Sequence, residues 1–335
     1  MQQKFSLPLV NTHTHAAMVA FRGMAEDLPL QKWLEEYIWP AEKQNVTTDF
    51  VYAKTKQAIL EMQKNGIKIF CDMYFFEEEV ARAAKELGMS VMIGEGILDF
   101  PTPSAKTPTE AFEITEKLLV RYADDPRVLV AVAPHSIYAV CEKNLIRAKK
   151  LAEKYSAPLH IHLAETKTEF DECLEKNNLT PIAYLDKLGL LGERTILAHC
   201  VWVTDADIKI MAERKVNVAH CPLSNLKLGS GIAPIIKMLE SGINVCLGTD
   251  GAASSNRLDI WEAGKFAALL QKGTSLDSSK ISTKDVVKMM TINGLKALGY
   301  AEFEGKEVVD MEKEIEEAEN YNFLYALNSE EVDFE

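Results

Sequence analysis

The sequence predicts an α/β fold, a (β/α)8 TIM barrel, on two observations. Short, continuous apolar runs alternate with longer amphipathic segments eight times within the first 300 residues. Such apolar runs are typical of parallel strands that are buried on both faces, and eight β/α units over about 250 residues fit a barrel. In addition, histidines or an aspartate stand at or just past the ends of six of these runs. A barrel gathers its active site at these strand ends.

The strands are expected where the apolar runs lie. In chain order these are residues 9–15, 67–74, 90–98, 128–133, 157–164, 195–198, 216–219 and 243–247. The alternative architecture is a doubly wound open sheet. Its dinucleotide-binding version is disfavoured, because no glycine-rich turn follows the first strand.

Helices are expected between and after the strands, where apolar residues recur at helical spacing. Gly66 and Gly88 each follow a predicted helix and suit its C-cap. Residues 16–40 form a loop and helix region closed by the Trp-Pro turn at 39–42. The other expected helices are 48–65, 77–87, 109–123, 144–155, 168–176, 181–188, 205–214, 232–240, 258–271 and 283–298.

Composition and charge describe an ordinary globular chain with an acidic end. Of the 335 residues 47% are hydrophobic and 26% are charged, and the net charge is −13. Residues 301–335 carry most of this negative charge. The acidic balance argues against nucleic acid as a partner.

The cysteines and the lack of long apolar stretches predict a cytoplasmic location. Six cysteines are scattered without a Cys-x-x-Cys pair, and most lie in strand-like apolar runs. Free thiols that pack as small hydrophobes suit a reducing compartment. No signal peptide precedes Asn11, and no apolar run approaches the roughly 18 residues of a membrane span. No membrane association is therefore expected.

The histidines and one aspartate predict a metal site. His13 and His15 lie two apart at the end of the first strand, so their imidazoles share one face. His162 and Asp250 stand at two other strand ends, which a barrel brings to the same rim. Three neutral imidazoles and a carboxylate suit one Zn²⁺ with a bound water, although the sequence does not distinguish Zn²⁺ from Fe²⁺.

Other polar residues at the rim predict proton transfer and support for the ligands. Glu165 follows His162 by three residues and could supply an acid, and Asp250 could take a proton from the water. His199 could hold that water or the developing oxyanion. His160 and His220 are expected behind the ligands, as residues that support them. The cysteines after His199 and His220 should point away from the site, since successive strand residues alternate.

Several segments in this order resemble the amidohydrolase superfamily. They are residues 12–15, 162–165, 198–200, 224–229 and 248–254. More narrowly, the chain resembles the 5′-methylthioadenosine/S-adenosylhomocysteine deaminases. Residues 21–28, 72–75 and 133–136 add to that match, and the resemblance spans about residues 7–300.

The resemblance implies a site and a reaction. A single Zn²⁺ per subunit would be held by His13, His15, His162 and Asp250; strand 4 ends in His135, where two-metal relatives carry a lysine. Glu42 would bind the ribose hydroxyls and His135 the purine, while Glu165, His199 and Asp250 assist attack at ring carbon 6.

The implied activity converts the adenine of 5′-modified adenosines to hypoxanthine with release of ammonia. The candidate substrates are 5′-methylthioadenosine, S-adenosylhomocysteine, 5′-deoxyadenosine and adenosine. One alternative is another amidohydrolase that acts on an amino- or chloro-heterocycle such as guanine, aminofutalosine or a triazine. A second alternative is a catalytically silent barrel that serves as a binding module.

The chain departs from the family pattern in two places. Glu95 stands where relatives that take S-adenosylhomocysteine carry an arginine, so neutral 5′-modified adenosines are favoured. Relatives also carry a small β-sandwich, of which only a short, incomplete C-terminal remnant is expected here. The predicted division is therefore a distorted catalytic barrel at 1–300 and an acidic tail at 301–335, and the uncovered face could pair subunits into a homo-oligomer.

Overall fold

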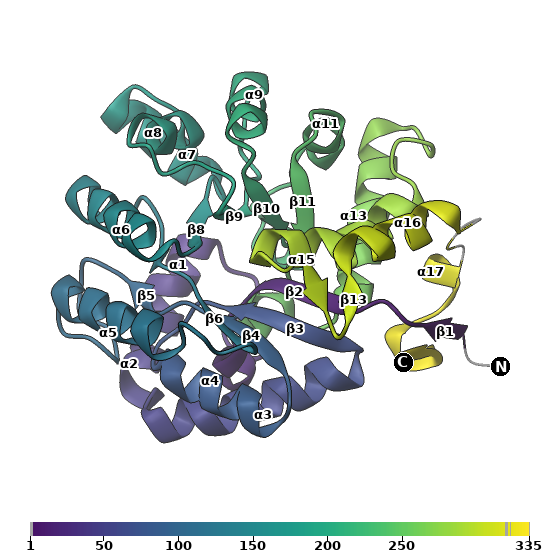
Figure 1. Cartoon of the computed structure of the whole chain (residues 1–335). Coiled ribbons are helices and arrows are strands. Elements are labelled where there is room, and N and C mark those ends of the chain that lie inside the picture. Colours follow the sequence, from purple (N-terminus) through teal and green to yellow (C-terminus); the bar gives the residue numbers. More distant parts are fainter. Residues whose placement is uncertain (1–2, 319–320, 322, 335) are drawn as a thin grey trace.

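Parallel strands lie at the centre of the molecule and helices surround them (Figure 1). The computed structural model describes residues 3–318, 321 and 323–334. One four-stranded sheet has the order β2–β3–β4–β6 and a second has the order β11–β10–β9–β8, while β5 pairs with β7. All of these pairings are parallel, which confirms the predicted α/β architecture.

The central strands coincide with the apolar runs of the sequence. Nearly every residue in them is buried, which explains why the runs are continuous rather than alternating. They are β2 (Leu9–Thr14), β3 (Ile67–Asp72), β4 (Ser90–Ile93), β5 (Gly96–Ile97), β6 (Val128–Val130), β7 (Ala133–Pro134), β8 (Leu159–Leu163), β9 (Thr195–His199), β10 (Asn217–His220) and β11 (Asn244–Leu247).

Hydrogen bonds also run between the two four-stranded sheets. Beyond β11, the amide of Asp250 donates to the carbonyl of His13 on β2 over 3.0 Å. On the other side, the amide of Val132 donates to Pro158 O over 2.9 Å and the amide of His160 donates to Val132 O over 3.0 Å. These bonds bring the C-terminal ends of strands from both sheets to one place.

The surrounding helices begin where the sequence offers capping side chains. Thr47, Thr107, Thr166 and Thr204 each accept a hydrogen bond from the first turn of the helix that follows. The helices are α3 (Thr48–Lys64), α4 (Glu77–Glu86), α5 (Pro108–Arg121), α6 (Glu142–Tyr155), α7 (Lys167–Asn177), α8 (Pro181–Lys187), α9 (Asp205–Arg214), α11 (Ile235–Glu240), α13 (Ile260–Ser275), α14 (Thr283–Met290) and α15 (Ile292–Leu298).

Three predicted elements are broken in the structure. The strand expected at 90–98 divides into β4 and β5 around Gly94, where a Cβ would lie only 2.8 Å from the Cβ of Ala133 and 3.3 Å from the carbonyl of Asp72. The strand expected at 128–133 divides in the same way into β6 and β7. The helix expected at 283–298 is interrupted at Thr291, whose backbone leaves the helical region (φ −130°, ψ −98°).

The segment between β2 and α3 is more helical than expected, and two short helices follow later strands. Glu42 lies inside a helix, so the predicted turn at 39–42 is wrong. Pro40 is compatible with this helix because it occupies the first turn, where a backbone N–H has no partner within the helix. The segment comprises η1 (Ala16–Phe21), α1 (Leu30–Trp33), the π-helical η2 (Leu34–Ile38) and α2 (Trp39–Asn45).

The two short helices that follow later strands are α10 (Pro222–Lys227) and α12 (Ala252–Ser255).

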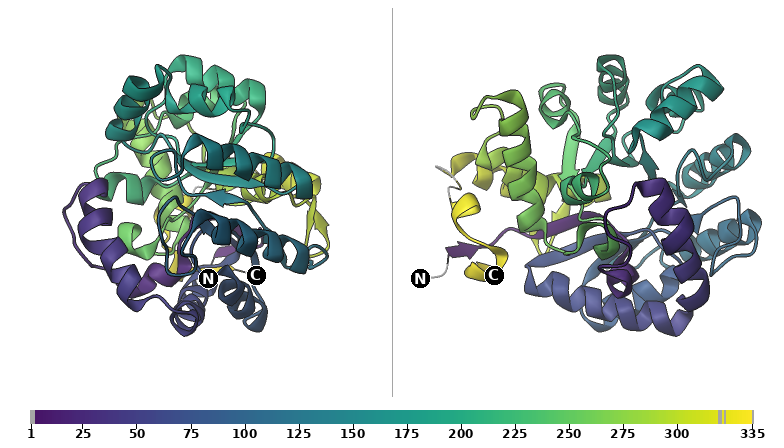
Figure 2. Two further views of the ribbon diagram at one scale, coloured as in Figure 1. Left: turned by 90° about the vertical axis from the view of Figure 1, so that its left-hand side faces the viewer. Right: turned by 180° about the vertical axis from the view of Figure 1, so that it is seen from behind.

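The two ends of the chain meet on one side of the molecule (Figure 2). Strand β1 (Gln3–Phe5) pairs in parallel with β14 (Val332–Phe334). The C-terminal tail was expected to be a remnant of a β-sandwich. In the structure its helix α16 (Val308–Glu317) packs against α14 and α15. The remaining elements are the hairpin β12 (Glu302–Phe303) and β13 (Lys306–Glu307), α17 (Phe323–Ala326) and η3 (Ser329–Glu331).

None of the helices in the described part of the chain combines the length and the apolar character that crossing a bilayer requires.

Candidate active site

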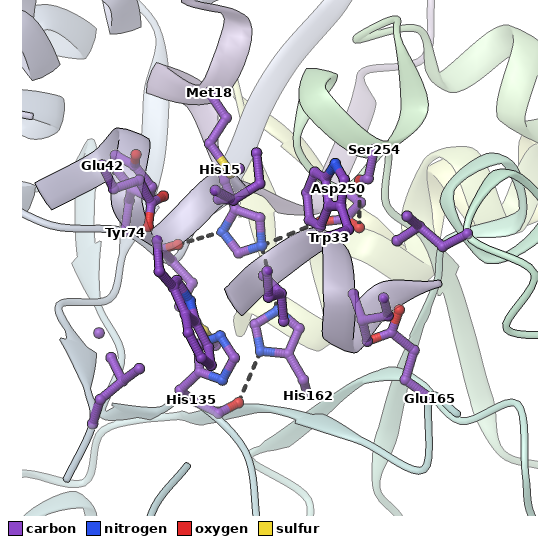
Figure 3. Close-up of a pocket in the computed structure, with 18 of the residues that line it drawn as sticks. His15, Met18, Trp33, Glu42, Tyr74, His135, His162, Glu165, Asp250 and Ser254 are labelled. Atoms are coloured by element: carbon purple, nitrogen blue, oxygen red, sulfur yellow. Dashed lines mark hydrogen bonds and ion pairs between the residues drawn. The ribbon is translucent and has the colours of Figure 1, made fainter. Parts of the chain in front are cut away.

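Three side chains from two strand ends converge at the centre of the site. His13 lies on β2, His15 follows it, and Asp250 comes just after β11. The Nε2 atoms of His15 and His13 lie 3.2 and 3.5 Å from the same carboxylate oxygen, Oδ1 of Asp250. Figure 3 shows His15 and Asp250 facing each other across this point.

His162 on β8, in the same sheet as β11, completes the cluster. Its Nε2 atom lies 3.3 Å from Nε2 of His15, and its ring centroid lies 4.7 Å from that of His13. The ring nitrogens of His13, His162 and His199 all lie within 4.8 Å of one another, as do the ligand atoms of His13, His15 and Asp250. The structure therefore places all four predicted ligands around a common centre.

Hydrogen bonds at the far side of each ring turn the Nε2 atoms toward that centre. Nδ1 of His15 contacts the carbonyl of Met73, and Nδ1 of His162 lies 2.8 Å from the carbonyl of His135. Carbonyls only accept, so each Nδ1 carries a proton, and Nε2 is the atom left to bind a metal. His160 plays the predicted supporting part, with its Nε2 3.0 Å from Nδ1 of His13.

The protonation states of the cluster suit metal binding. Burial lowers the pKa of His13 to about 4 and that of His162 well below its usual value, which keeps both rings neutral. Burial alone would raise the pKa of Asp250, but the imidazoles of His13 and His15 beside its carboxylate hold that pKa well below the usual range. Burial alone would lower the pKa of His15, but the Asp250 carboxylate raises it to about 9, so a metal ion would displace a proton from this ring. Neutral imidazoles and a carboxylate are the forms that bind metals.

The donor set fits a divalent metal ion. Nε2 of His13 is fully buried and has no hydrogen-bond partner among the described residues. The Nε2 atoms of His15 and His162 face each other across 3.3 Å, so either a proton or a metal ion lies between them. Three imidazoles and one carboxylate match zinc in an open, hydrolytic site, and Fe²⁺ accepts the same ligands.

Glu165 and His199 lie beside the cluster, as predicted. Oε2 of Glu165 is 3.7 Å from Nε2 of His199, and Ser230 donates to Oε1 over 3.4 Å. Burial raises the pKa of Glu165, which makes its protonated form available at a higher pH than usual. The arrangement places a potential acid next to an imidazole at the centre of the site.

A cavity of about 660 Å³ opens onto the cluster. Glu42 and His135 both line it, as do His15, His162 and Asp250 (Figure 3). Much of the remaining wall is apolar or aromatic, from Met18, Leu30, Trp33, Leu34, Ile38, Trp39, Met73, Tyr74, Phe75, Leu98, Tyr138 and Leu228. Among the described residues that line the cavity there is no lysine or arginine.

Two cavity residues have strongly shifted pKa values. Burial raises the pKa of Glu42 to about 7, although Tyr74 and His15 nearby favour the carboxylate. Burial lowers the pKa of His135 to about 3, so this ring is neutral, and its Nδ1 lies 3.1 Å from Oγ of Ser136. Both side chains can hydrogen-bond a ligand in the cavity.

Glu95 does not face the cavity, which corrects the argument built on its charge. The lining includes its neighbour Gly96 but not Glu95. Its carboxyl group is fully buried, accepts the backbone N–H of Glu77 at the start of α4 over 3.1 Å, and contacts the hydroxyl of Ser104. The division into β4 and β5 turns this side chain toward the helix, where the unpaired N–H groups attract an acid.

His220 also differs from its predicted supporting role. It is buried, and neither ring nitrogen has a hydrogen-bond partner among the described residues. Burial lowers the pKa of His220 to about 3. It therefore forms no hydrogen bond to any of the four predicted ligands.

Several polar residues that support the site were not assigned a role from the sequence. Asn225 Oδ1 lies 2.8 Å from Nδ1 of His199. Ser224 and Ser254 donate to Oδ2 of Asp250 over 2.5 and 2.8 Å. Ser224 and Asn225 belong to the segment 224–229 that carries part of the resemblance, but α10 is too short to be predicted.

Comparisons with known proteins agree with this geometry. The profile of the amidohydrolase family matches residues 8–303. A 5-methylthioadenosine/S-adenosylhomocysteine deaminase of Thermodesulfovibrio yellowstonii is 48% identical over 290 residues, which cover 87% of this chain and 66% of the relative. A 5′-deoxyadenosine deaminase of Methanothrix thermoacetophila is 46% identical over 86% of this chain and 68% of the relative.

A solved structure supports the same likeness. An adenosine deaminase from Xanthomonas campestris, crystallised with bound zinc, superposes with a TM-score of 0.86 at 38% identity. The match covers 88% of this chain and 67% of that chain. The chain thus spans about two thirds of the length of the proteins it resembles.

Proposed function

The chain belongs to the amidohydrolase family, and on that premise we propose that it is a zinc-dependent deaminase of 5′-modified adenosines. The observation that carries the proposal is the convergence of three histidines and one aspartate next to Glu165 at one end of the cavity. The proposed reaction converts adenine to hypoxanthine and releases ammonia. It is a hydrolysis of a carbon–nitrogen bond outside a peptide.

The proposed metal ligands are His13, His15, His162 and Asp250. A divalent metal held by them would supply hydroxide at neutral pH, because such an ion lowers the pKa of water to about 7. Fe²⁺ remains the alternative to Zn²⁺ because the same atoms can bind either ion.

The proposed catalytic residues are Glu165, His199 and Asp250. Glu165 donates a proton to the ring nitrogen beside the amino group while water adds to ring carbon 6. His199, whose Nε2 lies 3.7 Å from Glu165, stabilises the oxygen that adds. Asp250 takes one proton from that water and passes it to the amino group, and the second proton of the added oxygen returns to Glu165 as ammonia leaves.

The proposed substrate contacts divide the cavity into polar and apolar parts. Glu42 accepts hydrogen bonds from the ribose hydroxyls, and His135 contacts the purine. The apolar wall around Trp33 and Trp39 suits a neutral 5′-substituent such as methylthio. With no lysine or arginine among the described lining residues, a 5′-substituent that carries a carboxylate has no counter-charge.

We further propose that the two parallel sheets are the halves of one (β/α)8 barrel. The hydrogen bonds from Asp250 to His13 and from Val132 to Pro158 support closure at both seams. The proposed domain division stays at 1–300 for the catalytic body and 301–335 for the C-terminal segment. We also propose that two copies of the chain pair into a homo-oligomer, and sedimentation would test this pairing.

The direct test is an assay of zinc-loaded protein with 5′-methylthioadenosine. We expect loss of the adenine absorbance together with equimolar ammonia. The Glu165→Gln variant should lose about 10²- to 10⁴-fold in kcat and keep its zinc, because only the proton donor is removed. Absence of ammonia from all four adenosines, in protein with one zinc per chain, would contradict the proposal.

A further inference from the structure

Glu169 on α7 reaches back past the start of its own helix to the turn that carries Glu165. Its carboxyl group is 4% exposed and touches two backbone amides. The amide of Ala164 donates to Oε1 over 2.9 Å, and the amide of Glu165 donates to Oε2 over 2.8 Å. Both oxygens of the carboxyl group thus accept from two of the three residues that link β8 to α7.

This turn needs support because its backbone is strained. Ala164 has φ +52°, a left-handed conformation that residues with a Cβ seldom adopt. Its carbonyl accepts two further bonds, from the amides of Val201 and Trp202 over 2.9 and 2.8 Å. The peptide is therefore held on both sides, and the two oxygens of the Glu169 carboxyl group satisfy the two buried N–H groups.

The strained turn sets the direction of the Glu165 side chain. From this backbone its carboxyl group extends toward Nε2 of His199, 3.7 Å away, and toward Ser230. Glu165 itself has no other side-chain partner at these distances among the described residues. A change in the backbone at residues 164 and 165 would therefore move the carboxyl group directly.

We propose that Glu169 is a positioning residue that holds Ala164 and Glu165 in the conformation that aims the Glu165 carboxyl group into the site. The inference rests on the proposed function, in which Glu165 transfers the proton. It also explains why the position takes an acid: two neighbouring N–H donors need two acceptor oxygens, and an amide side chain offers only one.

The test compares Glu169→Gln with a matched control on the same helix. The glutamine has the same size, but its NH2 group would meet a backbone N–H. Glu172→Gln makes the identical change at an exposed position of α7. Both variants are measured for kcat and KM with 5′-methylthioadenosine, for zinc content, and for amide hydrogen exchange of residues 163–166.

We expect Glu169→Gln to lower kcat by about 10- to 100-fold, as loss of a supporting residue commonly does, with little change in KM and one zinc per chain. The amides of Ala164 and Glu165 should exchange faster than in the parent, while Glu172→Gln behaves like the parent. In the Glu165→Gln background the same change should cost little more, because Glu169 acts through Glu165.

Several results would overturn the inference. One is unchanged kcat and amide exchange in Glu169→Gln. Another is an equal loss of kcat in the parent and the Glu165→Gln background, which would indicate a general structural role. If the parent releases no ammonia from any adenosine, the proposed function fails, and the amide exchange alone decides whether Glu169 holds the turn.

Discussion

At the scale of single residues, the site depends on hydrogen bonds that determine which nitrogen of each histidine is free. The carbonyls of Met73 and His135 accept hydrogen bonds from Nδ1 of His15 and His162, so that the Nε2 atoms face the centre. The spacing of the sequence could predict the ligands, since strand geometry places His13 and His15 on one face. It could not predict these partners, because backbone carbonyls carry no sequence signature.

Asn225 tests whether a hydrogen bond at Nδ1 orients the ring of His199. Its Oδ1 accepts from Nδ1 of His199, which leaves Nε2 directed at Glu165. We expect Asn225→Ala to lower kcat by about 10- to 100-fold without loss of zinc, because the ring loses its orientation. Leu226→Ala, at the exposed neighbouring position of α10, is the control and should be neutral. Equal kcat values for the two variants would contradict the assignment.

The pKa of Glu42 predicts a pH dependence of substrate binding. Burial raises this pKa to about 7, so the carboxylate that accepts the ribose hydroxyls is present above pH 7 and is lost as the pH falls. KM for 5′-methylthioadenosine should therefore rise below pH 7. Glu42→Gln should raise KM and flatten this profile, whereas the exposed Glu36→Gln should keep it. A parent KM that is constant between pH 6 and 8 would refute the role.

The absence of cations in the described lining predicts discrimination between substrates. S-adenosylhomocysteine carries a carboxylate and an ammonium group at the 5′ end, and no lysine or arginine of that lining meets the carboxylate. We expect kcat/KM for 5′-methylthioadenosine to exceed that for S-adenosylhomocysteine by at least about tenfold, which corresponds to roughly 1.4 kcal/mol. A higher kcat/KM for S-adenosylhomocysteine than for 5′-methylthioadenosine would show that the apolar wall does not favour a neutral 5′-substituent.

At the scale of elements, the alternation of apolar runs and helices predicted most strands and helices near their observed positions. Burial on both faces gives each central strand a continuous apolar run that local sequence reveals. The division at Gly94 could not be predicted, because it results from contact with Ala133 on a distant strand. Likewise α10 and α12, of six and four residues, carry too little periodicity to be recognised.

Gly248 shows how tightly β11 approaches β2 at the site. A Cβ there would lie 2.8 Å from the Cβ of His13 and 2.9 Å from its carbonyl oxygen. We expect Gly248→Ala to destabilise the protein by about 1–3 kcal/mol and to lower its zinc content, because His13 must shift. In Gly273→Ala on α13, where the new methyl group meets nothing within 4 Å, stability should stay equal or rise. Full zinc occupancy in Gly248→Ala would contradict this account.

At the scale of the whole molecule, residues far apart in the chain come together twice, at the site and where the two ends of the chain pack against each other. Phe5 on β1 packs edge-on against Trp261 and Phe334, with ring centroids 5.4 and 6.3 Å apart. The pairing of β1 with β14 joins two three-residue strands from opposite ends of the chain. Strands of three residues are too short to show a recognisable sequence pattern. The sequence therefore predicted an acidic tail but not the pairing of β1 with β14.

The central claim is that one divalent ion binds between the two sheets. The most direct measurement is anomalous diffraction at the zinc absorption edge, from crystals of the zinc-loaded protein. The account predicts a single peak about 2.0–2.2 Å from Nε2 of His13, His15 and His162 and from Oδ1 of Asp250. A peak bound by other residues, or no peak in protein that is shown to be fully folded, would contradict it.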